Sequence, residues 1–418
     1  MDPTSPTPRL VSVPDPAEVV DLGAGRGPAW LDATLAERLP DLVRLRRDVH
    51  RHPELGRRES ATTALVVRTL RDAGIAARVL PGGTGAVADI GTDGPLIGLR
   101  ADIDALPMRE TTGLPYGSTI PDVAHMCGHD AHLTVLLGAA LALHRAPQLP
   151  GRVRVIFQPA EEMFPGGAHD VVAAGLVEGM QSIFALHCDP RLPVGQVGIR
   201  VGPITSTSDV IEVRVAGPGG HTSRPHLTAD LVYALGLLIT GLPALLTRRM
   251  DPRAAAVMVW GAVHAGQAPN AIPQDGVVRG TLRLMNRAAW DSAEHIVRSL
   301  VSEILTPTRV EYELTYSRGV PPVDNDLVCS TLQRAAVERG LGPDSVATVE
   351  QSSGAEDFAV YLDHVPGSLA RLGVWDGVRA PVDLHSPQFV LDERALAVGV
   401  RLTTHTALAA LGVDRVLG

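Results

Sequence analysis

The chain has 418 residues, of which 45% are hydrophobic and 20% are charged, and this balance argues against a disordered protein. Its length exceeds what one hydrophobic core usually serves, so we expect two domains. The formal net charge of −9, without a basic stripe, is unfavourable for binding nucleic acid or an anionic membrane.

The cysteines and the N-terminus predict a cytoplasmic location. The chain has three cysteines, Cys127, Cys188 and Cys329. This small, odd number does not form a disulfide framework and fits a reducing compartment. The first residues lack the basic start and apolar run of a signal peptide. The apolar stretch 231–246 is too short to span a membrane. We interpret residues 1–28, rich in Pro, Asp and Gly, as a flexible leader.

Helices and strands alternate through the first half of the chain. Leu31, Leu35 and Leu42 follow helical spacing until Pro53 ends the first helix. The predicted helices are 30–52, 60–74 and 132–144, and the predicted strands are 87–90, 96–99, 153–157 and 183–186. This alternation predicts an α/β domain with a mixed, largely parallel sheet flanked by helices.

The pattern changes near residue 206. Ile211, Val213 and Val215 alternate with charged residues, which is typical of a half-exposed strand. The elements that follow are a helix at 229–249, strands at 255–263 and 276–284, a helix at 288–305 and a strand at 310–315. They predict an α+β unit of two helices on an antiparallel sheet. The α/β pattern then resumes, with helices at 324–339 and 393–411. We therefore predict a catalytic domain of residues 29–205 and 319–418, interrupted by an inserted domain of residues 206–318.

Three polar clusters, 125–132, 158–162 and 185–190, carry the residues suited to chemistry. The second and third follow directly on apolar strands, and the first leads into a helix. In open α/β sheets the ligand crevice lies at the carboxyl ends of the strands, so these clusters are expected to meet in space.

The residue types in these clusters match a metal site. Thiolate, imidazole and carboxylate are the usual ligands of zinc-like ions. Cys127 and His129 are two residues apart, so both can point to one side of an extended segment. Glu162 and His187 add ligands from neighbouring strand ends, and His385 is a candidate for one more.

The adjacent carboxylates Glu161 and Glu162 suggest a division of labour. One of them binds metal, and the other takes the proton from a metal-activated water. Two ions about 3.5–4 Å apart that share this water would lower its pKa and polarise a substrate carbonyl. An amide is a natural target for such a site.

With these motifs, the chain resembles the aminoacylase and carboxypeptidase family of co-catalytic metallohydrolases. It is most similar to the amidohydrolase branch, which includes hippurate hydrolase and the indole-acetyl-amino-acid hydrolases of plants. The resemblance covers residues 45–411 and rests on segments 99–107, 127–132, 158–162, 219–221 with 225–226, 268–273, 280–283 and 356–358.

This resemblance implies roles for the metal-site residues. Cys127 would bridge two divalent metal ions, and the remaining ligands would be His129, Glu162, His187 and His385. Glu161 would be the general base. The thiolate ligand favours zinc, although members of the family are often activated by manganese.

The resemblance also implies roles outside the metal ligands. Asp104 would orient a ligand. The inserted domain would be a lid and a dimerisation surface, and its His221 would stabilise the oxyanion of its own or a partner's site. Asn270 and Arg283 would bind the substrate's carboxylate, although Asn270 alone also fits a turn and Arg283 alone also fits a surface charge.

The sequence thus predicts a metallo-amidohydrolase that cleaves N-acyl amino acids or similar small amides, acting as a homodimer or higher homo-oligomer. A dipeptidase or carboxypeptidase with the same site is the alternative among enzymes of this kind. A metal-dependent binding protein without catalysis and a thiol enzyme with Cys127 as the nucleophile are alternatives from other classes. Cys188 stands at a position where valine is common in the family that the chain resembles. It adds a thiol beside the predicted ligand His187.

Overall fold

The computed structural model describes residues 13–412, which form two compact units. The first contains residues up to 202, residues 325–350 and those from 360 onward; the second contains residues 203–324 and 351–359. The segment 351–359 was not assigned to the inserted unit from the sequence. It belongs there because, for example, the Gln351 amide donates hydrogen bonds to the carbonyl oxygens of Thr205 and Met285, at 2.8 and 2.7 Å.

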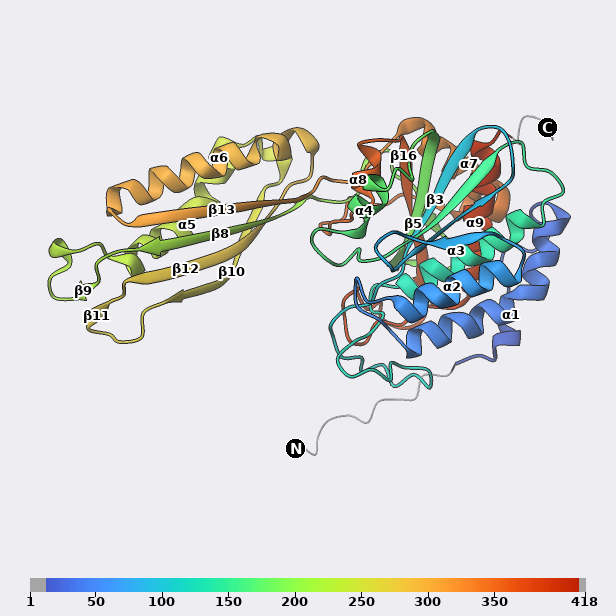
Figure 1. Ribbon diagram of the computed structural model, residues 1–418, viewed down its shortest axis with the longest axis horizontal. Coiled ribbons are helices and arrows are strands. Elements are labelled where there is room, and N and C mark those ends of the chain that lie inside the picture. The colour runs from blue at the N-terminus through green and yellow to red at the C-terminus, as the bar shows by residue number, and fades with distance from the viewer. Residues whose placement is uncertain (1–12, 413–418) are drawn as a thin grey trace. The chain divides into compact units, whose positions relative to one another are not determined.

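The first unit is built on an eight-stranded sheet in the order β1-β2-β4-β3-β5-β16-β6-β15 (Figure 1). Neighbours from β4 through β3 and β5 to β16 run parallel, whereas β1 and β2 add an antiparallel edge and β6 runs antiparallel to β16. The predicted mixed α/β class is therefore confirmed. The strands are β1 (Ala77–Val79), β2 (Ala86–Ile90), β3 (Leu96–Asp102), β4 (Arg152–Gln158), β5 (Met180–Pro193), β6 (Val197–Gly198), β15 (Val346–Ala347) and β16 (Gly367–Trp375).

Helices flank this sheet, and one of them, α3, begins within the polar cluster 125–132. Helix α3 begins at His129, directly after Gly128, whose φ of 89° turns the chain sharply. Nearly all of α3 is buried because it packs against α1, α9 and β3. The helices are α1 (Ala29–Arg51), α2 (Ser60–Asp72), α3 (His129–His144), α4 (Gly167–Ala173), α7 (Leu327–Leu341), α8 (Ala359–Leu362) and α9 (Arg394–Ala410).

Two sheet assignments from the sequence need correction. Strand β5 continues to Pro193, so His187 lies within the strand rather than after it; here β5 is paired with β16, with Arg371 opposite His187. Strand β16 was not predicted. It is almost entirely buried in the sheet, where tertiary packing outweighs the weak strand propensity of its glycine, serine and alanine residues.

The flexible leader stays a prediction: its first twelve residues lie outside the described part of the chain, and residues 13–28 include contacts with the last described helix. Asp21 accepts hydrogen bonds from the guanidinium of Arg401 at 2.6 and 2.8 Å, and Asp32 also pairs with Arg401. Arg401 is fully buried in α9. This ion pair ties residues near the N-terminus to the last helix of the described chain.

The second unit is a four-stranded antiparallel sheet in the order β10-β12-β8-β13. Ile211, Val213 and Val215 point from β8 into a core made with two helices, as their alternation predicted. The elements are β8 (Ser208–Ala216), β9 (Gly220–His221), α5 (Leu231–Arg249), β10 (Val257–Ala265), β11 (Ala271–Ile272), β12 (Asp275–Arg283), α6 (Arg287–Leu305) and β13 (Glu311–Val320). A short pair, β7 (Gly202–Pro203) and β14 (Asp324–Asn325), contains two of the four positions where the chain changes unit.

Helix α5 is the one described helix that is long and apolar enough to cross a membrane, judged by length and composition alone. The sequence had placed the corresponding apolar stretch below that length. In the structure, Leu231, Leu235, Leu238, Leu242 and Leu246 of α5 are buried in the core of the second unit, which is the position of a core helix.

Candidate metal centre

The five predicted ligands come from four separate segments of the first unit and converge. Cys127 precedes α3, His129 begins it, Glu162 lies in the loop after β4, His187 lies in β5, and His385 lies in the loop between β16 and α9. Their ligand atoms form two groups, each within 4.8 Å: one holds Cys127, His129 and His187, and the other holds Cys127, Glu162 and His385. Cys127 is common to both groups, which is the arrangement of a ligand shared by two ions.

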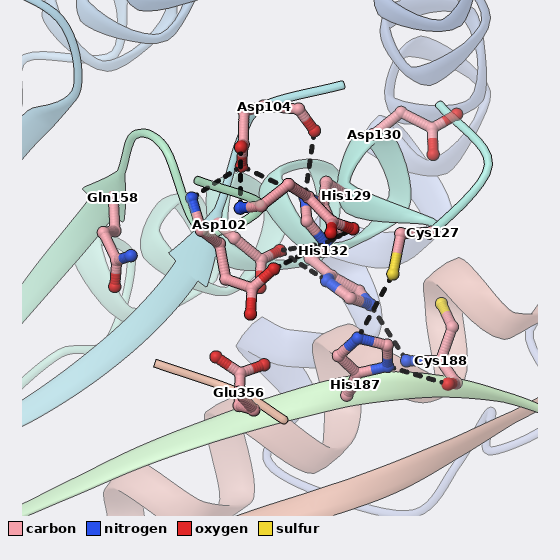
Figure 2. A network of polar contacts seen from close by, with 12 residues as sticks. Asp102, Asp104, Cys127, His129, Asp130, His132, Gln158, His187, Cys188 and Glu356 are labelled. Carbon is pink, nitrogen blue, oxygen red and sulfur yellow. Dashed lines mark hydrogen bonds and ion pairs between the residues drawn. The ribbon is translucent and has the colours of Figure 1, made fainter. Parts of the chain in front are cut away.

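The distances within these groups suit metal ligation. The Sγ atom of Cys127 lies 3.5 Å from Nε2 of His187 and 3.3 Å from Nε2 of His385. Glu162 Oε1 lies 2.9 Å from His385 Nε2 and 3.9 Å from His129 Nε2. Figure 2 shows the thiol of Cys127 pointing toward the ring of His187. All these contacts join atoms that coordinate transition metals.

Two of the histidines are oriented by backbone carbonyl groups. His129 Nδ1 lies 2.9 Å from the carbonyl oxygen of Asp104, and His187 Nδ1 lies 2.9 Å from that of Cys188. Each Nδ1 therefore carries a proton, and each Nε2 is left to face the cluster, where a bound metal ion would take its lone pair. This is the usual way in which proteins orient metal-binding histidines. Nε2 of His129 is buried and has no hydrogen-bond partner within residues 13–412, as expected of a nitrogen reserved for a metal.

Asp104 connects this histidine to the two glutamates. Its carboxylate accepts hydrogen bonds from the backbone N–H groups of Glu161 and Glu162, each at 3.0 Å. Figure 2 shows Asp104 beside His129, and the Oδ1 atom of Asp104 lies 3.3 Å from His129 Nδ1. The Glu161 carboxylate lies 3.9 Å from Nε2 of His129. Asp104 thus orients the ligand His129 and also holds the backbone of Glu161 and Glu162.

Electrostatics in the cluster favour a cation. Burial, together with the carboxylates of Glu162 and Glu161, raises the pKa of the Cys127 thiol well above its usual value. Burial lowers the pKa of His129, but the carboxylates of Asp102 and Asp104 outweigh it and raise the pKa to about 10. Both shifts reflect a buried concentration of negative charge. Divalent cations at this position would stabilise the thiolate and the carboxylates together, so the residues present fit a pair of metal ions.

His132 lies beside the cluster but is fully used by other partners. Its Nδ1 donates to Asp102 Oδ1 at 2.6 Å, and its Nε2 accepts the backbone N–H of Cys188 at 2.9 Å. The sequence had placed His132 outside the ligand set. Asp102, which holds His132, was not singled out, although its spacing of two residues from Asp104 could have indicated a shared direction.

The extra thiol of Cys188 is buried against the turn that begins α3. A Cβ atom built on Gly128 would lie 2.8 Å from the Sγ atom of Cys188, so no larger residue fits between the two cysteine-bearing segments without movement. Cys188 therefore packs as a small apolar side chain at this point.

The three residues predicted in the inserted domain lie in the second unit. His221 is exposed on β9, which pairs with β11 directly after Asn270, and the backbone N–H of Thr222 donates to the Asn270 carbonyl at 3.3 Å. Arg283 ends β12 and donates to the carbonyl of Ser353 at 3.0 Å. His221 and Asn270 are thus neighbours, Arg283 lies on another strand, and the roles of all three stay predictions.

Comparison with known proteins identifies the family of this chain. The family model "Peptidase family M20/M25/M40" matches residues 98–409. A Rhodococcus jostii protein named putative glutamate–cysteine ligase 2-3 is 51% identical over 91% of this chain, and the chain spans 48% of that relative's length. An N-acetylcysteine deacetylase of Bacillus subtilis is 37% identical over 88% of this chain and 97% of its own length.

A solved structure from Bacillus subtilis, described as a dinuclear metal-binding peptidase of the M20 family, has a TM-score of 0.78 and 34% identity. The match covers 89% of this chain and 98% of that one. The family resemblance found in the sequence is thereby confirmed. This chain therefore belongs to peptidase family M20/M25/M40.

Proposed function

We propose that the protein hydrolyses the amide bond of N-acyl amino acids, with Glu161 as the general base. The observation that carries this proposal is the place of Glu161. It is next to the ligand Glu162, its carboxylate lies 3.9 Å from Nε2 of the ligand His129, and it is not needed to complete either ligand group around Cys127.

The proposed ligands Cys127, His129, Glu162, His187 and His385 would hold two divalent ions, zinc or manganese. When bound, such a pair lowers the pKa of a shared water and polarises the substrate carbonyl. Glu161 would take a proton from the attacking water while the oxygen of that water bonds to the carbonyl carbon. Glu161 then gives the proton to the nitrogen that leaves when the C–N bond breaks. The products are a carboxylic acid and a free amino acid, so atoms and charge balance without another reactant.

The relatives suggest which acyl amino acid to test first. The deacetylase from Bacillus subtilis is named for N-acetylcysteine, and the relative from Rhodococcus jostii bears a name that concerns cysteine, although this chain matches about half of it. N-acetyl-L-cysteine is therefore the lead substrate. Hippurate, N-acetyl-methionine and unblocked dipeptides complete the panel, and a preference for the dipeptides would favour the alternative of a dipeptidase.

The Glu161→Gln variant tests the assigned base. It should keep both metal ions, as measured by elemental analysis, and lose at least about 10²-fold in kcat, because a positioned acid–base group contributes about 10²–10⁴-fold. Normal turnover by this variant would contradict the assignment. Wild-type activity that survives chelation but is lost on alkylation would instead favour Cys127 as a nucleophile.

The inserted domain is also proposed to form a homodimer. Val232 and Tyr233 of α5 and Val257, Val259 and Val263 of β10 are apolar side chains exposed on the second unit. If His221 serves a partner's site, mixing the Glu161→Gln and His221→Ala variants should restore activity through mixed dimers. No recovery, with light scattering showing a monomer, would contradict this arrangement.

A further inference from the structure

A buried carboxylate outside the metal ligands holds the turn that carries the proposed base. Glu59 is completely buried at the start of α2, and its Oε1 accepts a hydrogen bond from the backbone N–H of Ala160 at 2.8 Å. Ala160 directly precedes Glu161 and has a φ of 55°, a left-handed conformation that is unfavourable for alanine. Such a conformation persists only where its surroundings enforce it.

Two buried carboxylates therefore bind three successive N–H groups of this turn. Glu59 binds that of Ala160, and Asp104 binds those of Glu161 and Glu162. Asp104 also contacts His129, so its loss would disturb the metal ligands directly. Within residues 13–412, Glu59 makes no hydrogen bond with a proposed ligand side chain, so its loss would act on the site through the turn.

The segment that carries Glu59 is fitted against the same loop at two further points. A Cβ atom on Gly56 would lie 2.7 Å from Met163 Sδ and 3.1 Å from the Ala160 Cα, so a larger residue there would require Met163 and the turn to shift. Arg57 donates to the carbonyl of Pro165 at 3.0 Å and to the carboxylate of Asp170 at 2.7 Å.

The same segment is also joined to the end of β3. The Glu54 carbonyl accepts the N–H of Ala105, next to Asp104, at 2.8 Å. Residues 54–59 thus connect the segment that carries Asp104 with the segment that carries Glu161.

We propose that Glu59 is a positioning residue for catalysis: by holding the Ala160 N–H it keeps the strained turn in the conformation that directs the Glu161 carboxylate to the metal centre. This inference rests on the proposed function of Glu161 as the base. Its physical basis is that a buried N–H without an acceptor is unfavourable, so the turn would relax and move Glu161. A displacement of about 1 Å in a catalytic group can reduce the rate by about 10²-fold.

The test compares two substitutions at this position in the full-length, metal-loaded protein. Glu59→Gln retains an oxygen acceptor for Ala160 and should keep kcat within about threefold of wild type. Glu59→Ala removes the acceptor and should lower kcat by about 10–100-fold with little change in KM and two metal ions still bound. Glu54→Ala is the matched control, because Glu54 caps α2 through Ala61 and Thr62 without contacting the turn, and it should change stability but not kcat.

A second readout does not depend on activity. Hydrogen–deuterium exchange at the peptide covering 158–164 should speed up in Glu59→Ala but not in Glu59→Gln or Glu54→Ala. Should Glu59→Ala unfold, Gly56→Ala tests the same turn from its other side and should lower kcat in the same way.

The proposal is overturned if metal-loaded Glu59→Ala keeps wild-type kcat, or if the Gln and Ala variants lose kcat equally. Normal turnover by Glu161→Gln contradicts the proposed base instead, so the two failures are distinguishable.

Discussion

The Sγ atom of Cys127 lies 3.3 Å from Nε2 of His385, although 258 residues separate the two in the sequence. Cys127 also lies 3.5 Å from His187 Nε2, so one thiol is in reach of imidazoles from two different segments. A ligand that is common to two neighbouring cations must lie close to the other ligands of both, as the thiol of Cys127 does.

Asp104 should control metal affinity without being a ligand. Asp104→Ala removes the acceptor for two backbone N–H groups and a carboxylate contact of His129. Loss of such an orienting partner typically lowers metal affinity by about 10–100-fold, which competition with a chromophoric chelator would measure. Asp89→Ala, which removes a surface ion pair with Arg154 on the same sheet, should leave affinity unchanged. Wild-type affinity in Asp104→Ala would show that the ligands are oriented by other contacts.

Glu110 should contribute to acid sensitivity of the fold. Burial raises its pKa, but hydrogen bonds from His50, Ser118 and Thr112 outweigh burial and lower the pKa to about 2. A carboxyl with a lowered folded-state pKa stabilises the fold above its unfolded pKa near 4.5, and this stabilisation is lost as the pH falls toward 2. Melting temperatures measured from pH 7 to pH 2.5 should therefore fall less steeply below pH 4.5 in Glu110→Gln than in the wild type.

An exposed carboxyl provides the contrast for this experiment. Arg253 lowers the pKa of Asp251 to about 2 as well, but Asp251 lies on the surface. Solvent screens such surface pairs, so Asp251→Asn should leave the acid dependence of the melting temperature unchanged. Equal slopes for the wild type and Glu110→Gln would contradict the assigned role of Glu110.

The contact between Asp21 and Arg401 should stabilise the first unit. Asp21→Ala removes one of two carboxylates from a fully buried guanidinium. Removing one partner of a buried ion pair costs about 3–5 kcal/mol, and the remaining Asp32 places the expected loss at about 3 kcal/mol in urea unfolding. Asp15→Ala, in the same segment but exposed, should cost less than about 1 kcal/mol. An equal effect of the two variants would mean that the buried pair does not hold this segment.

The sequence predicted those parts of the site that depend on local pattern. Cys127 and His129 could be read as ligands because their spacing and the following helix are local features. Strand β16 could not be predicted from the sequence, because its small residues have low strand propensity. Its neighbours in the sheet stabilise it instead. The contact of Glu59 with Ala160, across 101 residues, was likewise invisible, since a buried carboxylate at the start of a helix resembles an ordinary solvated charge until its partner is known.

The predicted leader also has a long-range contact that the sequence did not reveal. Its composition indicated flexibility, but a single residue, Asp21, forms an ion pair with Arg401, 380 positions away. Composition describes the average tendency of a segment and cannot reveal one long-range pair. The direction of Glu161 relative to the ligands depends in the same way on Asp104, which lies 57 positions earlier in the chain.

Metal titration of the chelator-treated protein tests the central claim most directly. Zinc or manganese is added in known equivalents while hydrolysis of N-acetyl-L-cysteine is followed, with Cys127→Ser as the comparison. The structure predicts that activity is absent without metal, reaches its maximum at two ions per chain, and is lost in Cys127→Ser together with the second ion. Full activity in the metal-free protein, or at one ion per chain, would contradict a dinuclear centre built on Cys127.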